Sequence, residues 1–496
     1  MDKILNLDFS LIKDLLSFDR QNPLLFNSGL FLLLFAAFML IYQCVRRVRW
    51  LKMITVIAFS LYFYYKSSAG YCFILLGVCV SDYIIGIALG KSVRSWLRKS
   101  WVVLNVVLNV GMLVYFKYFN LLYETFCNIT STRFDPLDII LPAGISFFCF
   151  RSISYIVDIY RRQLEPCRNF LDYTFFLTFF PPLLAGPVVR AKDMLPQIKE
   201  NAMATHAMVS EGMFLIMAGL IKKVVIADYI SGNFVDRIFD NPTLYSGFEN
   251  LMGAFGFTIQ IYCDFSGYSD MAIGIALLMG YRFKDNFRAP FKAQSPTEFW
   301  KRWHISLSSW LMDYVYIPLG GNRKGRTRQN VNLMSTMVIG GLWHGASWMY
   351  VIWGAYHGIL LAIHKALSKA FRLPATLKGN RLITAANIFL TLNLMVIGMM
   401  IFRAQSLQHL WDMCHQITHN FNAQVITAFI EGYLFIVIAI VAAYMMHFLP
   451  ESWTRWGIRQ YSALPTVIQA IILALVLFLV IQTRQSDLVP FVYLQY

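Results

Sequence analysis

The chain has 496 residues, of which 57% are hydrophobic and only 14% charged, and its formal net charge is +16. Soluble domains carry about 45–50% apolar and about 25% charged residues, so a string of soluble domains is excluded, as are a disordered chain and a disulfide scaffold. The composition is typical of a polytopic membrane protein, in which the positive charge either orients the helices or binds something anionic.

The first 20 residues mix acids and lysines with apolar side chains, which indicates an interfacial amphipathic helix and not a cleavable signal peptide. Apolar segments that approach the roughly 20 residues of a membrane span follow along the whole chain. We expect about eleven spans in one membrane-embedded domain, 1–496. They lie near 24–43, 51–66, 71–90, 101–119, 139–160, 209–231, 251–280, 331–352, 382–402, 424–448 and 464–482, with shorter or re-entrant candidates near 172–190, 304–320 and 353–365.

Lysine and arginine follow the first, third and fifth of these spans, whereas the loop 120–138 has one arginine against three acids. Alternate loops are therefore basic, and the positive-inside rule places the N-terminus outside the cytoplasm. The basic residues in question are Arg46, Arg47, Arg49, Lys52, Lys91, Arg94, Arg98, Lys99, Arg161, Arg162 and Arg168.

No metal site is predicted. His409, His415 and His419 cluster in a polar segment, but the chain has no H-E-x-x-H pattern and no third ligand at a suitable spacing. We interpret this segment as a solvated loop.

The segment 262–270 places two carboxylates, Asp264 and Asp270, inside an apolar stretch together with Ser266 and Tyr268. Each charge at the centre of a lone membrane helix costs about 2.5–3.5 kcal/mol. Two interpretations stay open: these side chains bind a substrate in a wet cavity, or the acids pair with nearby lysines and arginines and hold helices together.

Two further segments carry histidines among tryptophans. Arg302, Trp303 and His304 lie in one of them, and Trp343 and His344 lie between glycines in the other. The ordinary pKa of histidine, near 6.5, suits a general base at neutral pH. His344 and His304 are therefore the catalytic candidates, and Trp303, Arg302 and Trp343 are candidates for binding the substrate or donor.

These motifs are long enough to compare with a known family. The blocks SYIVDIYR (154–161), FFPPLLAGPVVR (179–190), YCDFSGYSDMAIG (262–274), EFWKRWHISLSSWLMDYVYIPLGGNR (298–323), GGLWHGASW (340–348) and WGAYHG (353–358) resemble the membrane-bound O-acyltransferase family. The resemblance is to its bacterial branch, which includes alginate O-acetyltransferases and the teichoic-acid D-alanyl transfer proteins.

The resemblance implies an all-α integral membrane bundle of about eleven spans around a central funnel, in the bacterial cytoplasmic membrane. It places the family's essential histidine on His344 and its second motif histidine on His304. It implies an acyl thioester, most simply acetyl-CoA, as donor and no permanently bound cofactor. It also implies an extracytoplasmic polysaccharide acceptor and a separate partner that resembles an SGNH esterase, with no nucleic acid involved.

The segment 282–328 concentrates positive charge, with ten Lys and Arg against three acids. This excess suits a phosphorylated donor such as CoA, although part of it follows the positive-inside rule. Three alternatives stay open: D-alanyl transfer to teichoic acid or peptidoglycan O-acetylation by the same fold, a transporter, and a non-catalytic envelope scaffold.

Overall fold

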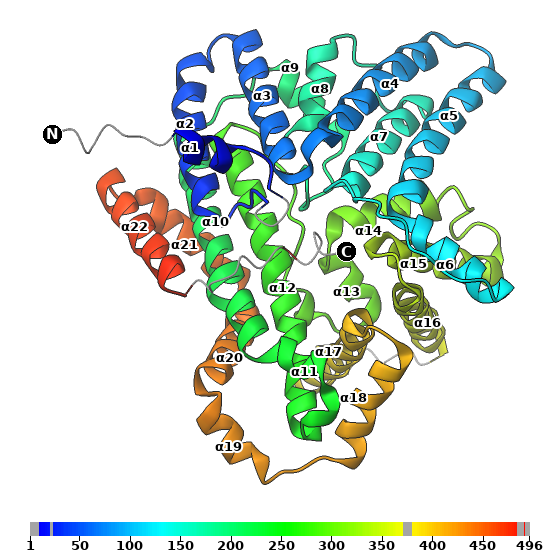
Figure 1. The fold of residues 1–496 in the computed structure, drawn as a ribbon, viewed down its shortest axis with the longest axis vertical. Coiled ribbons are helices and arrows are strands. Elements are labelled where there is room, and N and C mark those ends of the chain that lie inside the picture. Colours follow the sequence, from blue (N-terminus) through cyan, green and yellow to red (C-terminus); the bar gives the residue numbers. More distant parts are fainter. Residues whose placement is uncertain (1–8, 20–22, 371–378, 484–490, 492–496) are drawn as a thin grey trace. The chain divides into compact units, whose positions relative to one another are not determined.

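A computed structural model describes residues 9–19, 23–370, 379–483 and 491. Every regular element within these ranges is helical, which confirms the predicted all-α class (Figure 1). Contacts divide the chain into two compact units, Met1–Ala185 with Val189–Met203, and Gly186–Val188 with Ala204–Tyr496. The single domain 1–496 stays a prediction.

The first unit consists of short and long helices joined by tight turns. They are α1 (Phe9–Leu16), α2 (Gly29–Val45), α3 (Arg49–Ser68), η1 (Ala69–Tyr71), α4 (Cys72–Lys91), α5 (Ser95–Leu113), η2 (Val114–Tyr118), α6 (Phe119–Thr130), α7 (Ile145–Tyr160), α8 (Phe170–Thr178) and α9 (Ala191–Lys199). Part of the predicted N-terminal amphipathic helix is thus formed by α1, whereas residues 1–8 and 20 lie outside the described ranges.

One buried carboxylate joins four helices of this unit. Asp82 on α4 accepts hydrogen bonds from Asn105 on α5 (2.7 Å), Ser152 on α7 (2.8 Å) and Tyr173 on α8 (2.6 Å). A buried polar group is costly unless it is hydrogen-bonded, so these three donors make the arrangement of the four helices specific.

Arg151 on α7 is fully buried and donates to the carbonyl oxygens of Phe176, Leu177 and Pro182. These carbonyls lie at the end of α8 and in the irregular segment that follows it. The predicted re-entrant candidate 172–190 is therefore helical over 172–178 and irregular after that, and an arginine side chain satisfies three of its carbonyl groups.

The second unit begins with α10 (His206–Leu220) and η3 (Ile221–Asp228) and is built around the 32-residue helix α12 (Gly247–Leu278). Between and after them lie η4 (Ser231–Val235), α11 (Asp236–Asp240), η5 (Pro242–Leu244), η6 (Pro290–Lys292), α13 (Pro296–Arg302), α14 (Ile305–Leu311), η7 (Met312–Tyr316), α15 (Gly325–His344), α16 (Trp348–Ala370), α17 (Arg381–Arg403), α18 (Leu407–His419), α19 (Val425–Gly432), α20 (Leu434–Phe448), α21 (Glu451–Ala463) and α22 (Thr466–Thr483).

Two pairs of glycines bring α10 and α12 into backbone contact. A Cβ on Gly212 would lie 2.7 Å from the carbonyl oxygen of Gly274, and one on Gly219 would lie 2.5 Å from that of Gly267. The glycines of each helix are seven residues apart, so both pairs fall on one seam. Small residues at such a seam let apolar helices approach closely.

Two of the predicted spans are not continuous helices. The span predicted for 331–352 is interrupted after His344, because Gly345 takes an extended conformation (φ −166°, ψ 161°) and a new helix starts at Trp348. The span predicted for 424–448 is bent by 88° between α19 and α20. Hydropathy averages over both breaks, which is why the sequence pattern did not show them.

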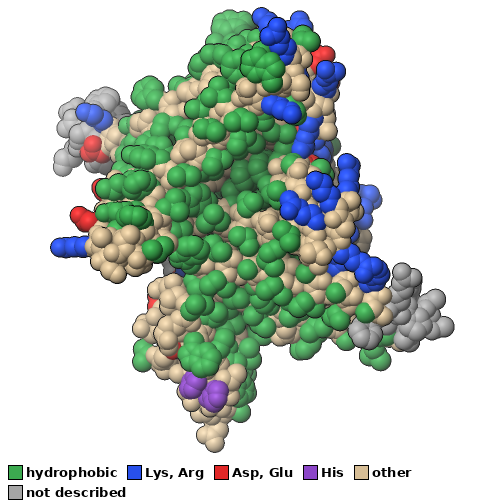
Figure 2. Space-filling model, turned by 90° about the vertical axis from the view of Figure 1, so that its right-hand side faces the viewer, with side chains coloured by type: hydrophobic (Ala, Val, Ile, Leu, Met, Phe, Trp, Pro, Cys, Tyr) green, Lys and Arg blue, Asp and Glu red, His purple; other side chains and the backbone are tan. Residues whose placement is uncertain are grey.

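Four helical stretches are long and apolar enough to cross a membrane: Arg49–Lys91, Ser95–Thr130, Arg381–Arg403 and Thr466–Thr483. The bent pair Val425–Gly432 and Leu434–Phe448 makes a fifth if it is one span. Hydrophobic side chains also cover much of the face shown in Figure 2, as a lipid-exposed surface requires. The count of about eleven spans stays a prediction.

Candidate active site

His344 is the last residue of α15 and lies in an aromatic cage. Its ring centroid is 5.1 Å from that of Trp343, 5.0 Å from that of Trp353 and 5.3 Å from that of Phe402. The side chain is 4% exposed. The C-terminal end of a helix carries partial negative charge, which favours positive charge on an imidazole that accepts a proton there.

The glycines near His344 allow the next helix, α16, to pack closely against this end of α15. A Cβ on Gly341 would lie 2.2 Å from the carbonyl oxygen of Tyr350, and one on Gly345 would lie 2.2 Å from the ring of the same tyrosine. The close approach at these glycines is made by α16, which turns back against α15 immediately after His344.

His304 lies in the turn between α13 and α14 and has left-handed backbone angles (φ 43°, ψ 55°), which residues other than glycine rarely adopt. Its ring is fully buried, 4.6 Å from that of Phe265 and 5.9 Å from that of Trp343. Because Trp343 also contacts His344, the two histidines predicted from separate motifs share one tryptophan as a neighbour.

The turn that holds His304 lies outside the candidate membrane spans, and burial lowers the pKa of His304 to about 3. Its imidazole is therefore neutral near pH 7. The Nδ1 atom lies 3.1 Å from Oδ1 of Asn286, a buried residue in the loop that follows α12.

The two acids of α12 form ion pairs with adjacent lysines of η3. Lys223 Nζ lies 2.5 Å from Asp264 and 2.8 Å from Asp228, and its side chain is 1% exposed. Lys222 Nζ lies 2.6 Å from Asp270. This geometry is that of the second interpretation, in which the acids hold helices together.

Three other predicted residues are packed side chains of the same unit. Ser266 and Tyr268 are buried on α12, and the Tyr268 ring meets that of Phe491 edge-on at 4.3 Å. Trp303 is 2% exposed and stacks on Phe299 with ring centroids 5.4 Å apart. Because Trp303 directly precedes His304, this packing supports the turn that carries His304.

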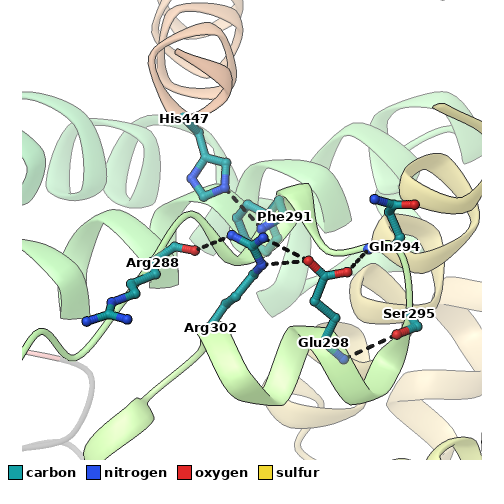
Figure 3. Close-up of polar contacts among 7 residues, drawn as sticks. All are labelled: Arg288, Phe291, Gln294, Ser295, Glu298, Arg302 and His447. Carbon is teal, nitrogen blue, oxygen red and sulfur yellow. Dashed lines mark hydrogen bonds and ion pairs between the residues drawn. The ribbon is translucent and has the colours of Figure 1, made fainter. Parts of the chain in front are cut away.

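Arg302 stabilises the loop that precedes α13 (Figure 3). Its Nε and Nη2 atoms lie 2.9 and 2.8 Å from Oε1 of Glu298, and its Nη1 donates to the carbonyl oxygen of Arg288 at 3.1 Å. The other oxygen of Glu298 accepts the backbone N–H of Gln294. On the neighbouring α20, His447 accepts the backbone N–H of Phe291 at 3.0 Å.

The basic segment 282–328 is divided by the structure. Arg282, Arg288 and Arg302 pair with Glu211, Asp285 and Glu298. Arg323, Lys324, Arg326 and Arg328 are exposed at the start of α15, and no ion pair to them is formed within the described ranges. This second group is available to an anionic ligand, as is the exposed Lys301.

No group of three or more His, Cys, Asp or Glu side chains is placed to hold a metal ion in the part of the chain that the structure describes. The segment interpreted as a solvated loop is instead the helix α18, on which His415 and His419 stack with ring centroids 4.5 Å apart.

Sequence reasoning missed the residues that support the two histidines. Asn286 and Phe402 lie outside the motifs, and Trp353 opens the block 353–358 but was not singled out as a site residue. The adjacent lysines at 222 and 223, in an otherwise apolar segment, are a signal that could have predicted the partners of Asp264 and Asp270.

Comparison with known proteins gives a consistent result. The model of the membrane-bound O-acyltransferase family matches residues 59–404. A probable alginate O-acetylase of Pseudomonas aeruginosa is 42% identical over 399 residues, which cover 79% of this chain and 74% of the relative. A peptidoglycan O-acetyltransferase of Helicobacter pylori is 34% identical (80% and 80%), and a teichoic acid D-alanyltransferase of Bacillus subtilis is 28% identical (55% and 71%).

Proposed function

The chain belongs to the membrane-bound O-acyltransferase family, and we propose that it moves an acetyl group from cytoplasmic acetyl-CoA to a polysaccharide outside the cytoplasmic membrane. Acyltransferase activity follows from the family and from relatives named as O-acetyltransferases and a D-alanyltransferase. The donor, the acceptor, the inner-membrane location and the residue roles are our proposal.

The observation that carries the mechanism is the pair of buried histidines, His304 and His344, whose rings both contact Trp343. His344 accepts the proton of an acceptor hydroxyl while that oxygen attacks the thioester carbonyl carbon. The tetrahedral intermediate then collapses, the C–S bond breaks, and the CoA thiolate takes the proton from His344. The products are an O-acetyl ester and CoA, and His344 returns to its neutral form.

His304 supports this step by orienting the acceptor hydroxyl. Its ring is fully buried, and its turn is held by the packing of Trp303 on Phe299. A bound geometry fixed in this way lowers the entropic part of the barrier.

The acceptor lies outside the cytoplasm in this proposal, and a separate SGNH-like partner completes delivery to the polysaccharide. The relatives named as alginate O-acetylases support the polysaccharide class. Peptidoglycan O-acetylation is the second candidate, supported by the relative at 34% identity. The donor is consumed in each turnover, so no permanently bound cofactor is needed.

The test is transfer of radiolabel from acetyl-CoA by the purified protein to alginate-type and peptidoglycan acceptors, with and without the partner. We expect His344→Ala to reduce transfer by about 10²- to 10⁴-fold, the usual contribution of a general base. The matched control is His415→Ala, because His415 is exposed on α18.

Transfer by His344→Ala at the wild-type rate would remove His344 from the mechanism and would favour a scaffold. Uptake of substrate into vesicles by the wild-type protein, without any acyl transfer, would favour a transporter. Preference for a D-alanyl thioester over acetyl-CoA would favour D-alanyl transfer to teichoic acid.

A further inference from the structure

Asn286 connects the loop after α12 with the turn that carries His304. It is 1% exposed, and its backbone carbonyl accepts the N–H of Ile305 at 2.9 Å. Its side chain lies among His304, Ser306 and Ser269, so one buried amide contacts residues of α12, of the loop and of α14.

The hydrogen bonds around this amide distinguish its oxygen atom from its nitrogen atom. Oδ1 lies 3.2 Å from the backbone N–H of Ser306, which can only donate. Ser306 Oγ accepts the backbone N–H of Val188 at 2.9 Å and donates its own proton to Oδ1 at 2.8 Å. On the other side, the Nδ2 atom of Asn286 donates to Ser269 Oγ at 3.1 Å. The atom that faces His304 is therefore an acceptor.

This acceptor fixes the position of the proton on His304. Nδ1 of His304 lies 3.1 Å from Oδ1 of Asn286, and an oxygen without a proton requires a donor opposite it. A neutral imidazole has one N–H and one bare nitrogen, so a proton on Nδ1 leaves the lone pair on Nε2.

We infer that Asn286 is a positioning residue, which holds His304 with its proton on Nδ1 and thereby makes Nε2 a hydrogen-bond acceptor for the hydroxyl of the acyl acceptor. The inference rests on the proposed function for its catalytic part, whereas the tautomer can be measured without it. In this tautomer His304 orients the hydroxyl that His344 deprotonates and does not donate a hydrogen bond to the oxyanion.

The first arm of the test reads the tautomer directly. Nitrogen NMR of ¹⁵N-histidine-labelled protein, with His304→Ala to assign the signals, should show Nδ1 of His304 as the protonated nitrogen in the wild type. A protonated Nε2 would overturn the inference, whatever the enzyme activity.

The second arm uses two substitutions in the acyl-transfer assay. Asn286→Leu removes the acceptor, so we expect kcat to fall by about 10- to 100-fold, as for other groups that orient a functional histidine, with little change in KM for acetyl-CoA. In the background of His304→Ala the same substitution should cause no further loss, because Asn286 acts through His304. Independent, multiplicative losses would overturn the inference.

Asn286→Asp is nearly isosteric and keeps an acceptor opposite Nδ1, so it remains informative if the leucine variant does not fold. A carboxylate beside His304 favours the imidazolium, so protonation of Nε2 occurs at higher pH and the acid limb of the kcat profile moves upward by about one unit or more. The other titratable or charged groups on the elements around His304 include Asp264 and Asp270 on α12, Lys284, Asp285 and Arg288 in the loop of Asn286, Glu298, Lys301 and Arg302 on α13, and His344 on α15. Asp264, Asp270, Asp285, Arg288, Glu298 and Arg302 are already in ion pairs.

The matched control is Asn380→Asp, which changes the charge equally and keeps the helix N-cap that Asn380 makes for α17. A profile of Asn286→Asp that superposes on the wild type would contradict the inference. An inactive wild type, or full activity in His344→Ala, would instead refute the proposed function.

Discussion

The left-handed backbone conformation of His304 lowers the stability of the folded protein locally. A non-glycine residue in this region costs roughly 1–2 kcal/mol, and such residues cluster where function requires a particular orientation. The turn is held by the hydrogen bond from the N–H of Ile305 to the carbonyl oxygen of Asn286 and by the Ser308 N–H that bonds to the carbonyl oxygen of His304. The sequence predicted the importance of His304 but gave no sign of this strain.

We expect His304→Gly to be more stable than His304→Ala, by about 1 kcal/mol, because glycine adopts positive φ without steric cost. Both variants should lose acyl transfer. Thermal unfolding in one detergent, followed by circular dichroism, measures the difference. A more stable alanine variant would show that the backbone there is not strained.

The two ion pairs that Lys223 forms, with Asp264 and with Asp228, allow a test of the two interpretations of the α12 acids. Removal of one member of a buried ion pair costs roughly 3–5 kcal/mol, because it leaves an uncompensated buried charge. Lys223→Met leaves the buried carboxylates of Asp228 and Asp264 without their lysine, whereas Asp264→Asn leaves Lys223 paired with Asp228. We therefore expect Lys223→Met to destabilise more than Asp264→Asn does.

If Asp264 is structural, the kcat of the folded Asp264→Asn protein should stay near that of the wild type, measured per mole of protein that survives gel filtration. A large loss of kcat at unchanged stability would restore Asp264 as a substrate-binding residue.

At the scale of elements, hydropathy predicted the helices whose interiors are uniformly apolar. The spans predicted for 382–402 and 464–482 correspond to α17, Arg381–Arg403, and α22, Thr466–Thr483. The breaks after His344 and between α19 and α20 were missed, because hydropathy averages over the extended backbone of Gly345 and over the 88° bend between α19 and α20. Helix breaks in membrane proteins are tolerated where neighbouring elements satisfy the backbone, which composition does not show.

The glycine seam between α10 and α12 gives a prediction at this scale. A Cβ on Gly219 would lie 2.5 Å from a backbone oxygen of α12 and 2.6 Å from Met271 Cγ, and neither helix can yield without moving its neighbours. We expect Gly219→Ala to destabilise the protein by about 1–3 kcal/mol, the usual cost of overpacking.

Gly111→Ala is the matched control, because it is also a helix-interior substitution and its Cβ would meet nothing within 4 Å. The control should be neutral or stabilising, since alanine is the better helix former. Equal melting temperatures for the two variants would mean that the seam is looser than the structure shows.

At the scale of the whole molecule, the net charge of +16 has more than one use. Some of the basic residues pair with acids, as Arg282, Arg288 and Arg302 do. Others are exposed, and the group at the start of α15 follows directly on the loop after the His304 block. The sequence predicted the total and its concentration at 282–328, but the division between paired and exposed charges required the structure.

We expect the triple substitution Arg323→Gln, Lys324→Gln and Arg326→Gln to raise KM for acetyl-CoA several-fold with little change in kcat, and to weaken the salt dependence of KM. The control is Lys91→Gln, Arg94→Gln and Lys99→Gln, which removes the same charge from exposed positions of the first unit. If both triple variants raise KM equally, the effect belongs to net charge and not to a donor-binding surface.

The ion pairs between η3 and α12 also bear on how the chain enters the membrane. Lys222 is made 48 residues before Asp270, its partner on α12, whereas Lys223 precedes Asp264 by 41 residues but also pairs with Asp228 of its own segment. The segment 221–228 therefore reaches the translocon before the partner of Lys222 has been made. Each such charge opposes partition into lipid by about 2.5–3.5 kcal/mol. We therefore expect the two helical segments to insert together as a hairpin, in which α12 supplies the acid that pairs with Lys222 and the glycines allow close contact. A cell that makes a variant lacking one partner should accordingly contain less of the protein in its membrane, because the defect arises during synthesis, before any substrate is bound.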